Sequence, residues 1–207
     1  TKYCDVKKGK TPLLQKIRER IEYIKSFPEL YQVATSFHRE LSTIYPIKEI
    51  ITTNWDDFFE KECGAIPIVT PDDFAFWNTP DRKVFKIHGS INNLGSIIAT
   101  EKDYRKCYRI LQHGIIGSSL KLMLATKVVI FLGYSFKDYD FNKIHSFLAK
   151  EMKDILPHSY IVNPNENIKE DAQHLNSTVI KTDATYFLKM LKQKLVERKV
   201  LISDERI

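Results

Sequence analysis

The spacing of apolar positions changes part-way along the chain. Before Pro46 these positions recur at helical intervals, which predicts one helix from Thr11-Pro12 and a second over residues 28–45. Threonine is a frequent N-cap and proline favours the first helical position, so we expect Thr11 to cap the first helix. The second helix is expected to present one apolar face, made of Leu30, Val33, Phe37 and Leu41.

After Pro46 short apolar runs rich in β-branched residues take over. They cover residues 47–52, 84–87, 128–132 and 160–162, with a weaker fifth run over 178–180. The helical stretches between and after them cover residues 103–112, 115–125, 142–153 and 185–198. Continuous apolar strands that alternate with helices are typical of a parallel sheet covered on both faces. The sequence therefore predicts an α/β fold with a Rossmann-like, doubly wound parallel sheet.

Composition sets limits on the class of protein. The 207 residues suffice for one hydrophobic core, and 43% are hydrophobic, as in ordinary globular proteins. No apolar run approaches the ~20 residues of a membrane-spanning helix. Three scattered cysteines without a CxxC pair suit a reducing compartment and offer no paired-cysteine zinc site. We expect a cytoplasmic protein without a metal.

The net charge of +6 raises the question of nucleic-acid binding. The basic residues are interleaved with glutamates along the helices, and no basic tract or nucleic-acid-binding motif is present. A solvated surface is the favoured interpretation, and direct binding to nucleic acid stays open.

Polar clusters follow four of the predicted strands. They are Thr52-Thr53-Asn54-Trp55-Asp56-Asp57, His88-Gly89-Ser90, Gly133-Tyr134-Ser135 with Asp138, and Asn163-Pro164-Asn165. In a doubly wound sheet, ligands bind outside the carboxyl ends of the strands, where these clusters are expected. Two clusters also lead into helices whose first N–H groups can receive phosphates. Asp57 is the expected cap of the first of these helices, which should stop at Gly64, and Asp138 or Asp140 of the second.

Each cluster also has a purely structural interpretation. Asn54 and the aspartates commonly cap helices and turn the chain, Gly89 and Gly133 permit tight turns, and a single histidine is more often structural than catalytic. Taken singly, each residue favours that interpretation. Their order and their shared place at strand ends favour a ligand site.

Four segments resemble the sirtuin superfamily, over residues 46–191. Ile51-Thr52-Thr53-Asn54-Trp55-Asp56 resembles the loop that holds asparagine and aspartate beside the nicotinamide ribose. Phe85-Lys86-Ile87-His88-Gly89 resembles the segment that ends in the catalytic histidine. Phe131-Leu132-Gly133-Tyr134-Ser135 is similar to the Gly-x-Ser turn that contacts the dinucleotide. Ile161-Val162-Asn163-Pro164 lies where sirtuins place an asparagine near the adenosine ribose.

Within that superfamily, the chain is most similar to bacterial sirtuin-like proteins of anti-phage systems, such as the Thoeris type. The resemblance implies hydrolysis of NAD to nicotinamide and ADP-ribose, depleting the infected cell in abortive infection. It implies Asn54 and His88 as catalytic residues, and NAD as substrate without a metal. It also implies seven residues that bind NAD: Thr53, Asp56, Gly89, Gly133, Ser135, Asp138 and Asn163. The zinc module of deacylating sirtuins is absent between His88 and Gly133, which argues against a deacylase.

One departure from the family concerns its N-terminal strand and Gly-Ala-Gly-x-Ser turn, which do not occur here. We expect them upstream of Thr1. The predicted organisation is a helical segment over residues 1–45, a sirtuin-like core over 46–195 and a helical extension over 196–207. Uncontrolled hydrolysis of NAD would kill the host. We therefore expect the activity to be regulated by homo-oligomerisation, by a helicase, Argonaute or phage-protein partner, or by both. A module that senses NAD or ADP-ribose without cleaving it is the alternative.

Overall fold

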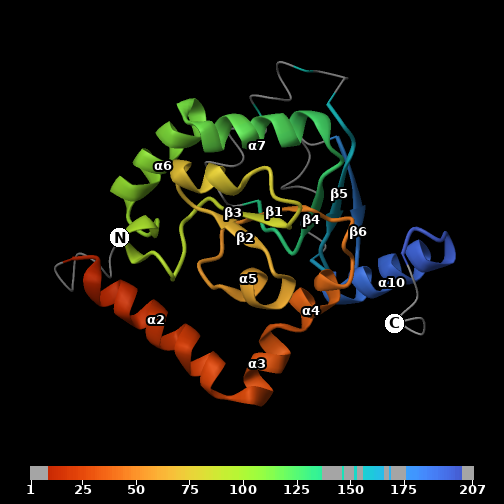
Figure 1. The fold of residues 1–207 in the computed structure, drawn as a ribbon, viewed down its shortest axis with the longest axis horizontal. Coiled ribbons are helices and arrows are strands. Elements are labelled where there is room, and N and C mark those ends of the chain that lie inside the picture. Colours follow the sequence, from red (N-terminus) through yellow and green to blue (C-terminus); the bar gives the residue numbers. More distant parts are fainter. Residues whose placement is uncertain are drawn as a thin grey trace. The chain divides into compact units, whose positions relative to one another are not determined.

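The computed structural model describes residues 9–136, 146, 152, 156–165, 168 and 176–201. The chain divides into two compact units, Thr1–Cys107 and Tyr108–Ile207 (Figure 1). Each unit contains a three-stranded sheet whose strand pairs are all parallel. The predicted α/β class with parallel strands is confirmed.

The first unit holds a sheet in the order β1-β3-β2. Its elements are α2 (Thr11–Ser26), α3 (Pro28–Ala34), α4 (Ser36–Ser42), β1 (Glu49–Thr52), α5 (Phe58–Cys63), β2 (Ile66–Ile68), η1 (Pro71–Phe76), β3 (Lys83–Lys86), η2 (Leu94–Ser96) and the start of α6 (Glu101–His113). The central strand β3 is buried along its whole length, although it begins and ends with a lysine. As predicted, α5 stops at Gly64.

The start of α2 differs from the prediction by one residue. Lys10 occupies the N-cap position, no side chain caps the helix, and Pro12 falls at the second helical position. The Lys10 ammonium lies 2.9 Å from the Asp103 carboxylate and also donates to the carbonyl of Ile97. These contacts hold Lys10 in place before the helix. Thr11 is therefore the first helical residue and not the cap.

The predicted second helix is broken in two at Thr35. The Thr35 hydroxyl donates to the carbonyl of Tyr31 at 2.7 Å, a local bond that bends helices. The predicted apolar face was therefore wrong in its first half, because Val33 is 75% exposed and Leu30 is also exposed. Leu41, beyond the break, is buried as expected.

Strand β2 was missed in the sequence because Pro67 interrupts a run of only three residues. Proline has no N–H to donate and is confined to sheet edges. β2 is an edge strand paired only with β3 among the described strands, which accommodates the proline.

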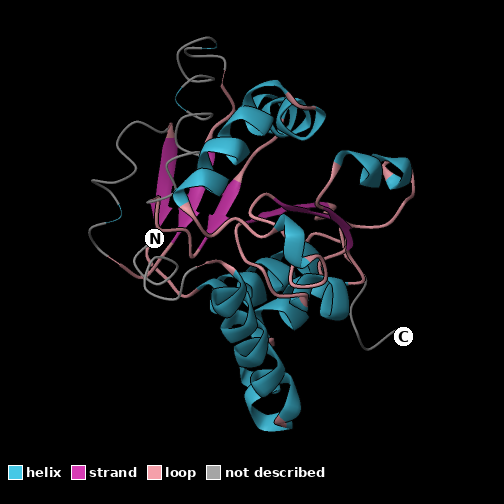
Figure 2. Cartoon of the chain, turned by 90° about the vertical axis from the view of Figure 1, so that its left-hand side faces the viewer, coloured by secondary structure: helices cyan, strands magenta, loops and turns pink. Residues whose placement is uncertain are grey.

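The second unit holds a sheet in the order β4-β5-β6, whose strands run alongside one another (Figure 2). Its elements are α7 (Ile115–Thr126), β4 (Ile130–Leu132), β5 (Ser159–Val162), β6 (Ser177–Ile180) and α10 (Ala184–Glu197). Asp183 caps α10 by accepting from two backbone N–H groups.

The helix predicted over 142–153 falls almost wholly outside the described residues, as do its expected caps Asp138 and Asp140. The predicted boundaries at 45 and 195 stay predictions.

None of the helices in the described ranges combines the length and the apolar character needed to cross a membrane.

Candidate functional site

Strands β1 and β3 bring Asn54 and His88 to the same end of the first sheet. Thr52, the last residue of β1, pairs with Lys86, the last residue of β3. The ladder continues one step further, because the Ile87 N–H donates to the Thr52 carbonyl at 3.1 Å. Asn54 and His88 each lie two residues beyond that last pair. Two residues 34 positions apart in the sequence therefore follow neighbouring strand ends.

The loop that carries Asn54 is fastened by local hydrogen bonds. The Asn54 N–H donates to the Thr52 hydroxyl at 3.1 Å, which turns the chain out of the strand. The Trp55 carbonyl accepts from the Ile91 N–H at 2.7 Å, which joins this loop to the segment after His88. Trp55 also packs against the buried cluster of Ile21, Ile91 and Ile97. Asn54 itself is exposed and Thr53 is partly buried, so the amide is open to a ligand.

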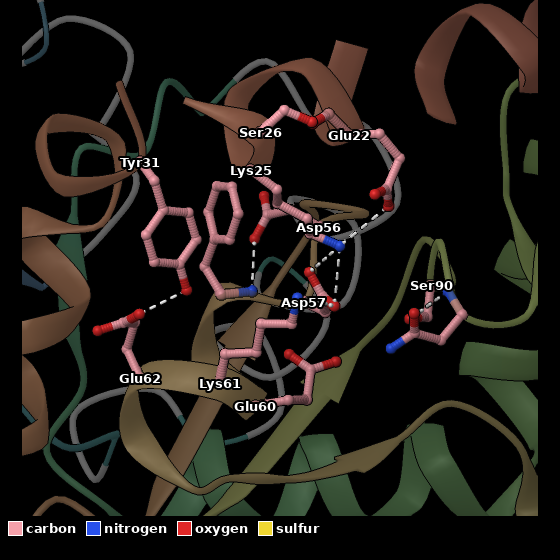
Figure 3. A network of polar contacts seen from close by, with 12 residues as sticks. Glu22, Lys25, Ser26, Tyr31, Asp56, Asp57, Glu60, Lys61, Glu62 and Ser90 are labelled. Atoms are coloured by element: carbon pink, nitrogen blue, oxygen red, sulfur yellow. Dashed lines mark hydrogen bonds and ion pairs between the residues drawn. The ribbon is translucent and has the colours of Figure 1, made fainter. Parts of the chain in front are cut away.

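Asp56 and Asp57 have different roles from those expected. Asp57 occupies the N-cap position of α5, yet its side chain makes no cap hydrogen bond. The cap bond comes from Asp56, which accepts the Phe58 N–H at 3.2 Å. Asp57 is 4% exposed and pairs with Lys25 at 3.0 Å and Lys61 at 3.4 Å (Figure 3). The prediction that Asp57 is simply the helix cap is corrected.

The pair of Asp57 and Lys25 ties helix α2 to this loop. Burial alone would raise the pKa of the Asp57 carboxyl, but the neighbouring Lys25 and Lys61 outweigh it and hold that pKa below its usual value. Burial would lower the pKa of Lys25, and Asp57 together with Glu22 reverses that effect and raises it. Both partners are thus charged at neutral pH, and the negative charge at residue 57 is compensated.

If Asp56 acts as a cap, Asp56→Asn is expected to keep both stability and the NAD hydrolysis that the resemblance to sirtuins implies. Asparagine accepts the same backbone hydrogen bond, whereas Asp56→Ala loses it at a cost of about 1 kcal/mol. Thermal unfolding and nicotinamide release of the two variants check this. A large fall in kcat for Asp56→Asn, with unchanged unfolding, would instead show that the negative charge of Asp56 acts on the substrate.

His88 is buried, 5% exposed, at the turn after β3. Its ring meets the ring of Tyr104 edge-on, with centroids 5.2 Å apart and an interplanar angle of 83°. Its carbonyl accepts from the Ile98 N–H at 2.9 Å. Tyr104 belongs to α6 and was not singled out in the sequence, where a tyrosine on a polar helix gives no sign of a contact with a strand end.

The first turn of α6 is held firmly, which fixes Tyr104. The Asp103 carboxylate accepts from the N–H groups of Ala99 at 3.2 Å and Thr100 at 3.0 Å. Burial would raise the pKa of Asp103, but Lys10 and these N–H groups lower it to about 2. The carboxylate therefore stays ionised through the neutral range and keeps the helix start in place.

Gly89 lies where another residue would collide with the backbone. Its φ is +88°, and a Cβ built on it would lie 2.3 Å from the carbonyl oxygen of Ser96. Its N–H donates to the Lys86 carbonyl at 3.0 Å, which closes the turn around His88. Glycine is thus required for the turn, whether or not it also contacts a ligand.

The second unit brings together Gly133, Ser135 and Asn163 at the ends of β4 and β5. Gly133 has a φ of +64° and donates its N–H to the Val162 carbonyl at 3.0 Å. The Asn163 side chain donates to the Tyr134 carbonyl at 3.1 Å and accepts from the Asn165 N–H at 2.9 Å. Ser135 is exposed. The Asn163 side-chain amide therefore joins two of the predicted polar clusters, the one that contains Gly133 and the one that contains Asn163 itself. Asp138 lies outside the described residues.

A buried lysine beneath the Asn54 loop was also missed. Lys86 has a fully buried side chain, and its ammonium lies 2.9 Å from the Glu60 carboxylate. A lysine inside an apolar strand was the available signal, because lysine is almost never fully buried without a partner. Within the described residues no group of three or more His, Cys, Asp or Glu side chains is placed to hold a metal.

Comparison with known proteins gives a consistent result. A family model described as a SIR2-like domain matches residues 48–201. The chain is 35% identical over 115 residues to "NAD(+) hydrolase ThsA" of Enterococcus faecium, covering 53% of this chain and 24% of that protein. The protein of the same name in Cytobacillus dafuensis is also 35% identical over 115 residues, covering 53% and 23%. "Defense-associated sirtuin 2" of Bacillus subtilis is 22% identical over 138 residues, covering 63% and 13%. The chain thus spans less than a quarter of the length of these relatives.

Proposed function

Because the chain belongs to the SIR2-like domain family, we propose that it is the catalytic part of an NAD hydrolase that acts in anti-phage defence. The observation that carries the proposal is the strand register, which sets Asn54 and His88 at neighbouring strand ends. An exposed amide and a buried imidazole that follow neighbouring strand ends suit a reaction that must orient a sugar and handle one proton. The names of the relatives in Enterococcus faecium and Cytobacillus dafuensis support this choice of substrate.

The proposed reaction breaks the bond between the ribose and nicotinamide. Nicotinamide is cationic in NAD and leaves as a neutral molecule that keeps the bonding electron pair, so no acid is needed to protonate it. The ribose carbon passes through an oxocarbenium-like state, as in glycoside hydrolysis. Water forms the new bond and loses one proton, which gives ADP-ribose.

In this scheme His88 is the base, for the water or for a ribose hydroxyl, because imidazole exchanges protons near neutral pH. The Asn54 amide orients the ribose or the attacking water. Thr53, Asp56 and Gly89 form the nicotinamide side of the site. Asp56 acts there mainly by shaping the loop, since its carboxylate already accepts the Phe58 N–H.

The other NAD-binding residues of this proposal follow strands β4 and β5. Gly133 and Ser135 contact the phosphates or ribose from their turn, with Asp138 in the same segment. Asn163 serves the adenosine ribose, and its bond to the Tyr134 carbonyl supports an additional part in shaping the Gly-x-Ser turn. No metal takes part in this proposal.

The proposed biological role is depletion of NAD in the cytoplasm of an infected cell. Such an activity needs control, which we assign to oligomerisation or to a partner in the same defence system. Regulation of this kind keeps the enzyme inactive until infection. NAD is then hydrolysed only in infected cells, as abortive infection requires.

The test is the incubation of the full-length protein with NAD, alone and with candidate activators, followed by chromatographic measurement of nicotinamide and ADP-ribose. Equal amounts of both products are expected. Binding of NAD or ADP-ribose without release of nicotinamide would favour the sensing module instead. Appearance of O-acetyl-ADP-ribose with an acetylated peptide would favour a deacylase.

A further inference from the structure

Lys86 makes two contacts that bear on the Asn54 loop. Its ammonium donates to the Glu60 carboxylate at 2.9 Å and to the backbone carbonyl of Asp56. The side chain is 0% exposed. The Asp56 carbonyl lies two residues after Asn54, inside the loop that joins β1 to α5.

A buried ammonium is costly unless its hydrogen bonds are made. Glu60 compensates the charge of Lys86. Burial raises the pKa of the Glu60 carboxyl, and Lys86 offsets part of that rise. The Asp56 carbonyl is a neutral acceptor, so its contact with the ammonium is not needed to balance charge. This contact satisfies a second N–H of the ammonium and joins the loop to β3.

We propose that Lys86 is a positioning residue, which holds the loop over residues 53–57 so that Asn54 is presented beside His88. The inference rests on the NAD hydrolase proposed above. Strand β3 supplies both Lys86 and, two residues later, His88. One strand therefore sets the place of the histidine and, through the ammonium, the place of the asparagine loop.

The loop is held from a second side by the pair of Asp57 and Lys25, drawn in Figure 3. Lys25 donates to the side chain of Asp57, and Lys86 donates to the backbone carbonyl of the preceding residue, Asp56. Asn54 lies outside both contacts and stays exposed. A rigid loop that carries an exposed amide is what orientation of a substrate requires.

The same strand supplies a matched control. Lys83 is also buried, and its ammonium donates to the carbonyls of Thr79 and Asp81, each at 2.7 Å. These contacts lie at the opposite end of β3 from His88. Lys83→Met thus removes a buried ammonium from the same strand without touching the Asn54 loop.

The experiment compares the full-length protein with two variants, Lys86→Met/Glu60→Gln and Lys83→Met. The double variant removes both charges, so no uncompensated carboxylate is left in the interior. Circular dichroism and thermal unfolding establish that each variant is folded. The readouts are kcat and KM for NAD, together with amide hydrogen exchange of residues 53–57 measured without NAD.

For the double variant we expect kcat to fall about 10- to 100-fold, because small displacements of an orienting group have effects of this size. We expect a smaller change in KM and faster exchange in residues 53–57. Lys83→Met should keep both kcat and the loop exchange. If the double variant does not fold, Lys86→Arg keeps the charge but alters the geometry at the Asp56 carbonyl, and the same two changes are expected.

Unchanged loop exchange in the folded Lys86 variant would overturn the positioning proposal, as would a kcat no lower than that of Lys83→Met. The exchange measurement does not depend on turnover. Absence of NAD hydrolysis in the unaltered protein, together with faster loop exchange in the variant, would therefore refute the proposed function and leave the positioning of the loop supported.

Discussion

Replacement of either His88 or Asn54 by alanine is expected to abolish measurable release of nicotinamide from NAD. Loss of a positioned base lowers rates by about 10²- to 10⁴-fold. Loss of the amide removes the group that orients the ribose or the water. Both residues follow the Thr52–Lys86 pair of neighbouring strands, and neither lies within those strands. The variants should therefore keep the fold.

The measurement is the initial rate of nicotinamide release, made beside thermal unfolding and equilibrium binding of NAD. Asn92→Ala and His113→Ala are suitable controls, because both residues are exposed and neither belongs to the proposed site. The controls should retain activity. Full activity in a folded His88→Ala protein would assign the base to another residue, and the scheme proposed for this site would fail.

The sequence predicted that Asn54 and His88 follow neighbouring strand ends, as the register shows, because parallel strands have a simple geometric consequence. Polar residues that follow such strands gather at one end of the sheet, so Asn54 and His88 could be paired without a structure. Their fine arrangement depends on turns, and glycine and threonine supply these. Thr52 and Gly89 are both evident in the sequence. The hydrogen bond that the Thr52 hydroxyl accepts and the positive φ of Gly89 are known only from the structure.

Contacts across long sequence separations were out of reach. Lys25 and Asp57 are 32 residues apart, and Lys86 and Glu60 are 26 apart. Neither lysine was assigned a partner from the sequence. Asp57 was consequently interpreted as a helix cap, the commonest role of an aspartate before a helix. Only the packing of α2 and β3 around α5 shows that the two carboxylates balance a partly buried lysine, Lys25, and a fully buried one, Lys86.

The break at Thr35 and the missed strand β2 have a different cause. In each case a single residue contradicts the pattern around it. Thr35 sits in an otherwise continuous helical pattern and bends it through its hydroxyl. Pro67 interrupts a short β-branched run that is nevertheless a strand, because its missing N–H falls on the sheet edge. Averaged apolar periodicity cannot detect such positions.

The second large effect is expected at Gly89. Gly89→Ala should destabilise the protein by about 2–3 kcal/mol, because a Cβ there adds backbone strain to a steric clash. The carbonyl oxygen of Ser96 would lie 2.3 Å from the new carbon and belongs to the backbone, so no side-chain rotation relieves the contact. The turn must open, and His88 moves with it. We therefore expect kcat to fall together with stability.

Gly95→Ala is the matched control, since it lies in the same loop and its new Cβ would meet only the Asn93 side chain, at 3.6 Å. That substitution should leave unfolding and NAD turnover almost unchanged. Chemical denaturation and nicotinamide release of the two variants separate the outcomes. Equal stability of Gly89→Ala and Gly95→Ala would show that the turn at Gly89 tolerates an ordinary residue. The place of His88 would then depend on its packing against Tyr104 more than on the turn.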